Sequence, residues 1–101
     1  MGNTTTQSPW ILDTASTTTY ILAAGNRIQV NKMIWYPNAA NNDIIIKDGN
    51  GNEKWNVRAT ADSANKESYG AEHFTGPEEF DGFQLHTLDG GSVYVYFEVL
   101  T

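Results

Sequence analysis

The segment Asp48-Gly49-Asn50-Gly51-Asn52 carries side-chain oxygens at the spacing that calcium-binding loops use for their first three ligands. Such a loop also needs glycine at its sixth position and a bidentate carboxylate at its twelfth, where this chain has Glu53 and Ala59. Asp-Gly and Asn-Gly pairs between β-forming runs are typical of tight hairpin turns. We therefore predict a hairpin turn, and leave a cation at residues 48–53 as an open alternative.

Two histidines, His73 and His86, could contribute to a metal site together with nearby carboxylates. They are thirteen positions apart and fall in different predicted elements, whereas metal sites favour tight, repeated ligand spacings. His86 lies beside an apolar residue in a predicted strand, which favours a structural role. The chain has no cysteine, so thiol ligands and disulfides are excluded. We expect no metal and no cofactor.

Neighbouring carboxylates at Glu78, Glu79 and Asp81 could support acid–base catalysis. More often such a cluster lies in a solvated loop, and a chain this small shows no sign of a cleft. Ser63 and Ser68 lack the sequence context of a nucleophile elbow. We expect a non-enzymatic protein and rank a small hydrolase using Glu79 and Asp81 as the weakest alternative.

The chain is rich in aromatic residues, with three tryptophans and five tyrosines. Tyr94 and Tyr96 alternate with valines and should share one face of the last predicted strand. Exposed rings of this kind stack on sugars in carbohydrate-binding modules, and they also cover sheet faces at subunit contacts. We favour the subunit contact because the N-terminus lacks the basic and apolar regions of a secretion signal.

Short β-forming runs separated by Gly, Asn and Asp predict a single all-β domain, an antiparallel β-sandwich of jelly-roll or immunoglobulin-like type with about seven strands. The hydrophobic alternation changes phase near Asn31-Lys32, which predicts either a bulge or a strand buried on both faces. The expected strands are Trp10–Thr14, Thr18–Leu22, Arg27–Tyr36, Asp43–Lys47, Lys54–Arg58, Phe80–Leu88 and Ser92–Val99.

The predicted core takes the inward-facing residue at every second position of these strands. Residues 59–79 form the longest irregular stretch, and a loop of this length in a small domain is usually a contact loop, which makes Tyr69 and Phe74 contact candidates. The expected core comprises Trp10, Leu12, Ile28, Val30, Ile45, Trp55, Val57, Phe83, Leu85, Val93, Val95 and Phe97.

Residues 1–9 are predicted to form an extended N-terminal arm that precedes the domain at residues 10–101. The arm is polar, with three successive threonines at Thr4, Thr5 and Thr6, and it has no apolar face to bury. We expect hydrogen bonds to another chain to order it, as an added strand or a strap. These threonines join Tyr94 and Tyr96 as candidate contact residues.

The formal net charge of −6 excludes the basic footprint that nucleic-acid binding needs. Binding to anionic membranes is disfavoured for the same reason. No apolar run approaches the length of a membrane span. We therefore expect a neutral, basic or proteinaceous partner.

Five motifs carry a resemblance to a known group of proteins: Trp10-Ile11-Leu12-Asp13-Thr14, Ile34-Trp35-Tyr36-Pro37, Ile45-Ile46-Lys47-Asp48-Gly49-Asn50-Gly51, Asp81-Gly82-Phe83 and Val93-Tyr94-Val95-Tyr96. Together they resemble small β-rich proteins of tailed bacteriophages, including phages of marine bacteria and cyanobacteria. The resemblance implies a virion component assembled in the host bacterial cytoplasm, and among such components a capsid decoration (cement) protein.

Its implied partners are the major capsid protein or another virion protein and further copies of itself, with a trimer among the alternatives. A fibre, tail or head–tail accessory protein, or a carbohydrate-binding module used in host adsorption, is the alternative function.

Overall fold

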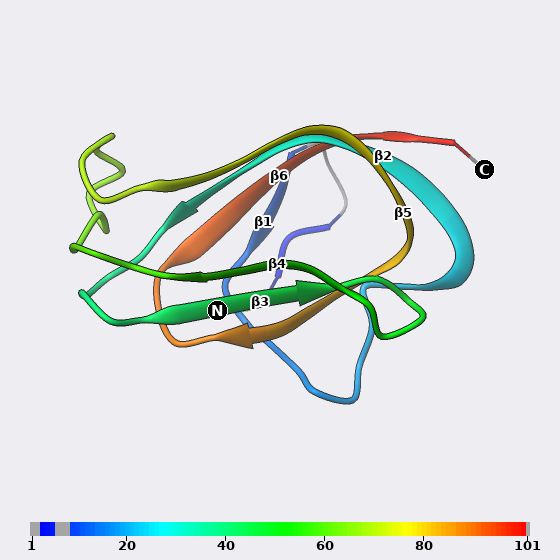
Figure 1. The fold of residues 1–101 in the computed structure, drawn as a ribbon, viewed down its shortest axis with the longest axis horizontal. Helices are drawn as coiled ribbons and strands as arrows, with labels where there is room; N and C mark the ends of the chain where they lie inside the picture. The colour runs from blue at the N-terminus through cyan, green and yellow to red at the C-terminus, as the bar shows by residue number, and fades with distance from the viewer. Residues whose placement is uncertain (1–2, 6–8, 101) are drawn as a thin grey trace.

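The computed structural model of the chain describes residues 3–5 and 9–100, and within them the fold is all-β and antiparallel (Figure 1). The described residues form six strands in the order β1-β6-β2-β5-β3-β4. The strands are β1 (Trp10–Leu12), β2 (Leu22–Tyr36), β3 (Asp43–Lys47), β4 (Glu53–Arg58), β5 (Glu72–Leu88) and β6 (Ser92–Val99). This confirms the all-β, sandwich-like fold, with one strand fewer than about seven.

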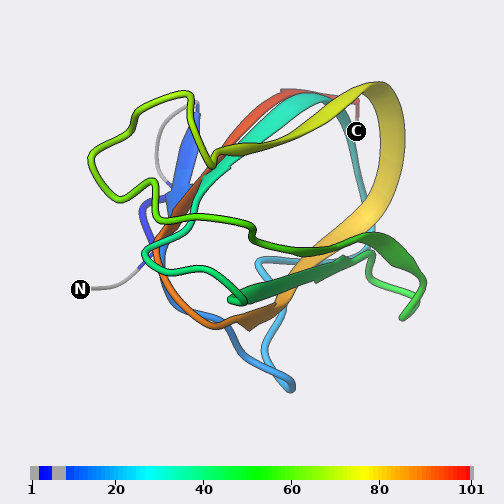
Figure 2. The ribbon, with the colours of Figure 1, turned by 60° about the vertical axis from the view of Figure 1, so that its left-hand side comes forward.

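The long strand β5 joins the two layers of the molecule. Its first part, Glu72–Phe83, pairs with β2, and its last part, Gln84–Leu88, pairs with β3. The strand bends between these parts, so that β1, β6 and β2 form one layer and β3 and β4 form the other (Figure 2). Gly82 lies at the bend with φ of 82°, a conformation that favours glycine.

A β-bulge in β2 explains the phase change in its sequence. The pairing of β2 with both β5 and β6 shifts register between Val30 and Lys32. The extra residue lets Met33 and Trp35 point inward on one side of the bulge while Val30 points inward on the other. This confirms the first of the two alternatives predicted from the sequence.

Two predicted segments are wrong. Among the described residues, 18–21 are not a strand, because this stretch makes only scattered bonds to β5, such as Ile21 N–H to the Phe83 carbonyl at 2.9 Å. The irregular stretch predicted at 59–79 ends at residue 71, where β5 begins. The start of β5 was missed because its exposed, polar side chains give no hydrophobic alternation.

The core lies between the two layers and confirms eight of the predicted residues. Ile45 was wrongly placed inside: Ile44 and Ile46 point inward and Ile45 points outward. Trp55, Val57 and Phe97 are only partly buried, at the edge of the core. The buried hydrophobic residues are Trp10, Leu12, Ile28, Val30, Met33, Trp35, Ile44, Ile46, Ala59, Phe80, Phe83, Leu85, Val93 and Val95.

Candidate functional site

The turn between β3 and β4 is the first place where the sequence suggested chemistry. Asp48 is 5% exposed and accepts hydrogen bonds from the backbone N–H groups of Asn50 and Asn52, both at 2.9 Å, and from the Asn52 amide at 3.1 Å. Burial opposes its charge, but these bonds outweigh it and keep the pKa of Asp48 below its usual value. The predicted hairpin turn is confirmed, and the Asp48 carboxylate holds it together.

Asp81 fixes this turn against the bend of β5. One of its carboxylate oxygens accepts the Gly25 N–H at 2.6 Å and the other accepts the Asn50 amide at 3.3 Å. Its backbone carbonyl accepts the Gly49 N–H at 2.8 Å. We call this meeting point of residues 24–25, 48–52 and 81–82 the turn junction. The acidic side chain here has a structural partner on each oxygen.

The carboxylates of Glu78 and Glu79 form ion pairs on the protein surface. Glu79 accepts a hydrogen bond from Arg27 Nε at 2.7 Å, and Glu78 lies 3.0 Å from Lys54 Nζ. The hydrogen bond from Arg27 lowers the pKa of Glu79. A general acid needs its pKa raised instead, so Glu79 is poorly suited to that role in the hydrolase considered above.

The two histidines do not come together. His73 is exposed near the start of β5, whereas His86 lies near its other end and its Nδ1 contacts Thr87 Oγ1 at 2.9 Å. Within residues 3–5 and 9–100, no three His, Asp or Glu side chains group as metal ligands.

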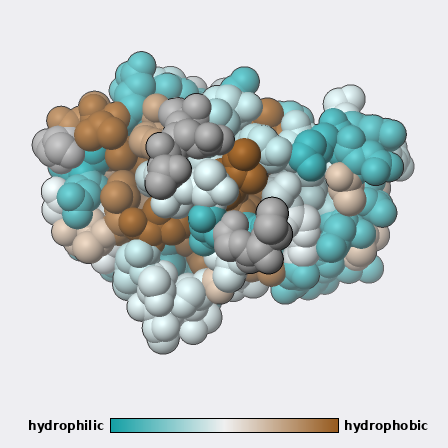
Figure 3. Space-filling view, turned by 180° about the vertical axis from the view of Figure 1, so that it is seen from behind, coloured by the Kyte–Doolittle hydropathy of each residue, from teal (hydrophilic) through white to brown (hydrophobic). Residues whose placement is uncertain are grey.

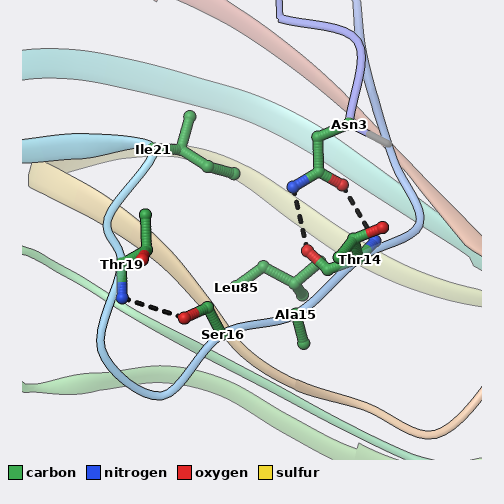
Figure 4. Close-up of a pocket in the computed structure, with 7 residues that line it drawn as sticks. All are labelled: Asn3, Thr14, Ala15, Ser16, Thr19, Ile21 and Leu85. Carbon is green, nitrogen blue, oxygen red and sulfur yellow. Dashed lines mark hydrogen bonds between the residues drawn. The ribbon is translucent and has the colours of Figure 1, made fainter. Parts of the chain in front are cut away.

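Two small pockets lie beside the described part of the N-terminal arm. One of about 260 Å³ is lined by the apolar Ile21 and Leu85 and by polar residues that include Asn3 and Thr19 (Figure 4). The second, of about 240 Å³, includes Thr5 among its lining residues. On the side of the molecule that carries β1, hydrophobic residues are exposed among polar ones (Figure 3). No titratable side chain lines the first pocket, so it holds no acid–base group.

Described arm residues bind their own chain. Thr4 and Ile11 exchange two backbone hydrogen bonds of 2.7 and 2.9 Å. The Asn3 side chain accepts the N–H groups of Asp13 and Thr14 and donates to the Thr14 carbonyl at 2.9 Å. This corrects the expectation that only another chain can order the arm. Thr5 is exposed, and Thr6 lies outside the described residues.

The outer face of the β1–β6–β2–β5 layer gathers three of the contact candidates, Thr4, Tyr94 and Tyr96. Direct cross-strand pairing runs from Thr4 to Ile11, Tyr94, Ile34 and His73, so these five residues form one continuous row. We call the row and its outward-facing neighbours the tyrosine face. It comprises Thr4, Ile11, Lys32, Ile34, Tyr36, His73, Tyr94 and Tyr96.

The rings on the tyrosine face are held by their neighbours. Tyr36 and Tyr94 meet edge to face, with centroids 5.7 Å apart and planes at 89°. Lys32 Nζ lies 4.6 Å from the centroid of the Tyr96 ring. Both contacts favour defined ring positions on a half-buried surface. Sequence reasoning found Tyr94 and Tyr96 but missed Tyr36, although Tyr36 lies two positions beyond Ile34 in an alternating strand.

The other two candidates lie elsewhere. Tyr69 is 76% exposed in the loop between β4 and β5. Phe74 is half-buried and meets the rings of Trp55 and Phe80 edge to face, so it belongs to the margin of the core more than to a contact surface.

Comparisons with protein-family models, with curated proteins and with solved structures found no match to this chain. The described part of the chain contains no helix that could span a membrane.

Proposed function

We propose that the protein is a non-enzymatic structural component of a phage virion, which decorates and reinforces the outer capsid surface by contacting the major capsid protein. The phage assignment rests on the sequence resemblance. The contact role rests on the tyrosine face, where three tyrosines and two isoleucines lie together on the outside of the sheet. Aromatic residues of this kind are enriched in protein–protein interfaces.

The chemistry of the face suits a partner protein. Ile11 and Ile34 flank Tyr94 in the central row, which offers apolar area around a hydroxyl group. Lys32 and His73 are exposed at its margin and supply polar groups at the rim. Binding through such a face needs no reactive group. This is consistent with the carboxylates of Asp48 and Asp81, which bond to N–H groups of their own chain.

A carbohydrate-binding module used in host adsorption is the second candidate, because three tyrosines share the face. Sugar stacking needs rings that lie flat and accessible. Tyr36 and Tyr94 are perpendicular instead, and Lys32 lies over Tyr96. The geometry therefore supports the protein contact better than the glycan contact.

Quantitative protein analysis of purified virions tests the location. We expect many copies per virion, as shell decoration requires. A handful of copies would place the protein in a fibre or tail, and its absence from virions would contradict the proposal.

Binding to capsids that lack the protein tests the face itself. Tyr94→Ala should weaken binding about thirtyfold, which corresponds to an interface residue worth about 2 kcal/mol. Tyr20→Ala is the matched control, because Tyr20 is an exposed tyrosine outside the face. Equal binding by both variants would remove the tyrosine face from the proposal. Binding on a glycan array that Tyr94→Ala abolishes would support the carbohydrate module instead.

A further inference from the structure

The sheet has few uncovered edges. The edge at β1 is covered by Thr4, which pairs with Ile11. The last part of β5 is flanked by residues 16–21, which bond to the carbonyls of Phe83 and Leu85. Among the described residues, β4 pairs with β3 alone, and Glu72–Phe80 of β5 pairs with β2 alone. These two strand edges are therefore available for another strand.

The two uncovered edges differ in their protection. Pro77 interrupts the β5 edge, and a proline offers no N–H to an added strand. Strand β4 has no proline, and its lysine points away from the edge. Lys54 Nζ lies 3.0 Å from the Glu78 carboxylate and 5.3 Å from the centroid of the Phe80 ring. An inward-pointing charge and a bulge both protect a strand edge, and in β4 both lie at its first end, around Lys54. The rest of the strand, Trp55–Arg58, pairs regularly with β3 and has neither a proline nor a bulge.

The distribution of charge favours a second copy of this chain as the partner of the β4 edge. The β3–β4 hairpin contains three of the twelve acidic residues and three of the six basic residues, so it is formally neutral. The rest of the chain carries the whole net charge of −6. Two copies therefore repel each other least where these hairpins meet. The acidic residues of the hairpin are Asp43, Asp48 and Glu53, and the basic residues are Lys47, Lys54 and Arg58.

We propose that β4 pairs antiparallel with β4 of a second copy around a two-fold axis at Asn56, giving a sheet that continues through both molecules. Glu53, Asn56 and Arg58 share the outer side of the strand: the Asn56 amide bonds to Glu53 at 3.0 Å, and Arg58 pairs with Asp43 of β3 at 2.9 Å. Strand β4 has a bulge at Lys54, because its pairing with β3 passes from Trp55 directly to Glu53. Antiparallel pairing centred on Asn56 therefore brings Arg58 of each copy opposite this bulge, where Glu53 of the other copy takes the outward position. The charges therefore complement each other at both ends.

The inner side of the strand matches as well. In the same register, Trp55 of one copy lies opposite Val57 of the other. Both side chains are only partly buried within a single molecule, so pairing covers apolar surface twice. This surface is separate from the tyrosine face, and the inference is independent of the proposed function.

The dimer should be weak in dilute solution. A six-residue strand is about 20 Å long, and contacts along it fall short of the roughly 1,200 Å² that stable interfaces bury. Copies held close together on a common surface would pair more readily, because their effective concentration is higher.

Sedimentation velocity over a range of concentrations tests the charge pairing. We expect the native chain to dimerise at high concentration, and Glu53→Arg or Arg58→Glu alone to remain monomeric. An equimolar mixture of these two variants should dimerise again, because each introduced charge then meets its opposite. Glu67→Arg is the control for net charge, since Glu67 is exposed in the loop between β4 and β5. A native chain that stays monomeric throughout, or variants that dimerise as it does, would overturn the proposal.

A cysteine cross-link tests the register and leaves both charges in place, so it decides the matter even if Arg58→Glu unfolds. The chain has no cysteine of its own. Asn56→Cys should form a disulfide-linked dimer on mild oxidation, because the two-fold axis places residue 56 opposite itself at a Cβ separation of about 5 Å. Asn65→Cys, in the exposed loop, should not. Equal cross-linking of the two variants would contradict pairing through β4.

Discussion

The turn junction and the tyrosine face differ in whether their polar side chains are bonded within the fold or accessible on its surface. At the junction, Asp48 and Asp81 hold backbone and amide N–H groups, so their acceptor capacity is used within the fold. On the tyrosine face, Tyr94 and Tyr96 alternate with buried valines and remain half-exposed on the outside of the sheet. The two carboxylates bond to groups of their own fold, whereas the two tyrosines are accessible on the outer surface.

This difference shows how to weigh such residues in a small β protein. A short carboxylate next to glycine and asparagine is the natural acceptor for the N–H groups of a tight turn. A tyrosine in a strand has no such local partner, and its placement depends on which side of the sheet faces the core. Substitutions in the two regions should therefore differ in their effects on stability and on binding.

The largest expected effect is on stability at the junction. Asp48→Ala removes a buried carboxylate and leaves two backbone N–H groups and an amide of the turn without their acceptor, which should lower the free energy of unfolding by about 3 kcal/mol. Urea denaturation measures this. Asp48→Asn keeps one acceptor oxygen and should lose less, and Glu98→Ala, at an exposed site, should change little. A loss for Asp48→Ala as small as that for Glu98→Ala would break the contrast.

Acid should weaken the protein through the same groups. Hydrogen bonds lower the folded-state pKa values of Asp43, Asp48 and Glu79, so the unfolded chain takes up protons more readily than the folded one. Their stabilising contribution is complete above the ordinary carboxyl pKa of about 4 and is lost as the pH falls through the lowered values.

Urea midpoints measured between pH 7 and pH 2.5 check this prediction. We expect little change down to about pH 5 and a decline below about pH 4. Asp48→Asn should show a shallower decline, because one of the contributing carboxylates is gone. Identical slopes for the two proteins would exclude Asp48 as a contributor.

On the tyrosine face, substitutions should affect binding more than stability. Tyr94→Ala removes an edge-to-face contact with Tyr36 and should lower stability by only about 1 kcal/mol, while binding suffers more. A double-mutant cycle with Tyr36→Ala isolates the ring contact. If Tyr94→Ala lowered stability as much as Asp48→Ala, the tyrosine face would contribute to stability as the core does. That result would argue against the face as a contact surface.

The smallest effect belongs to the arm. Asn3→Ala removes three hydrogen bonds to Asp13 and Thr14, two of them exposed and one partly buried, and should lower stability by about 0.5 kcal/mol. Thermal unfolding monitored by circular dichroism can detect this, with Asn65→Ala as the exposed control. A loss of several kcal/mol would mean that the arm is integral to the fold.

Local chemistry made part of the structure predictable. The Asp-Gly and Asn-Gly pairs fixed the β3–β4 turn, and the phase change beside Lys32 located the bulge, because both features arise from neighbouring residues. The role of Asp48 within the turn follows from the same local chemistry.

Features that depend on pairing between distant strands could not be predicted from the sequence. Glu72–Glu79 is polar and contains Gly76 and Pro77, and only its partner β2 makes it a strand. Ile45 stands between two other isoleucines, so composition gave no indication of which would face inward. Tyr36 joined the tyrosine face only when β2 and β6 were brought side by side. Tertiary pairing overrides local preference at each of these places.

The pairing of β1 with β6 has a consequence for the order of events during folding. Trp10 lies opposite Val95, so the first of the six described strands to be synthesised has to wait for the last before it gains its partner. Until then Trp10 and Leu12, both buried in the finished molecule, lack the strand that covers them. Strand β1 therefore stays open to mispairing until β6 has been made, and closure of this layer is a late step in the folding of the domain.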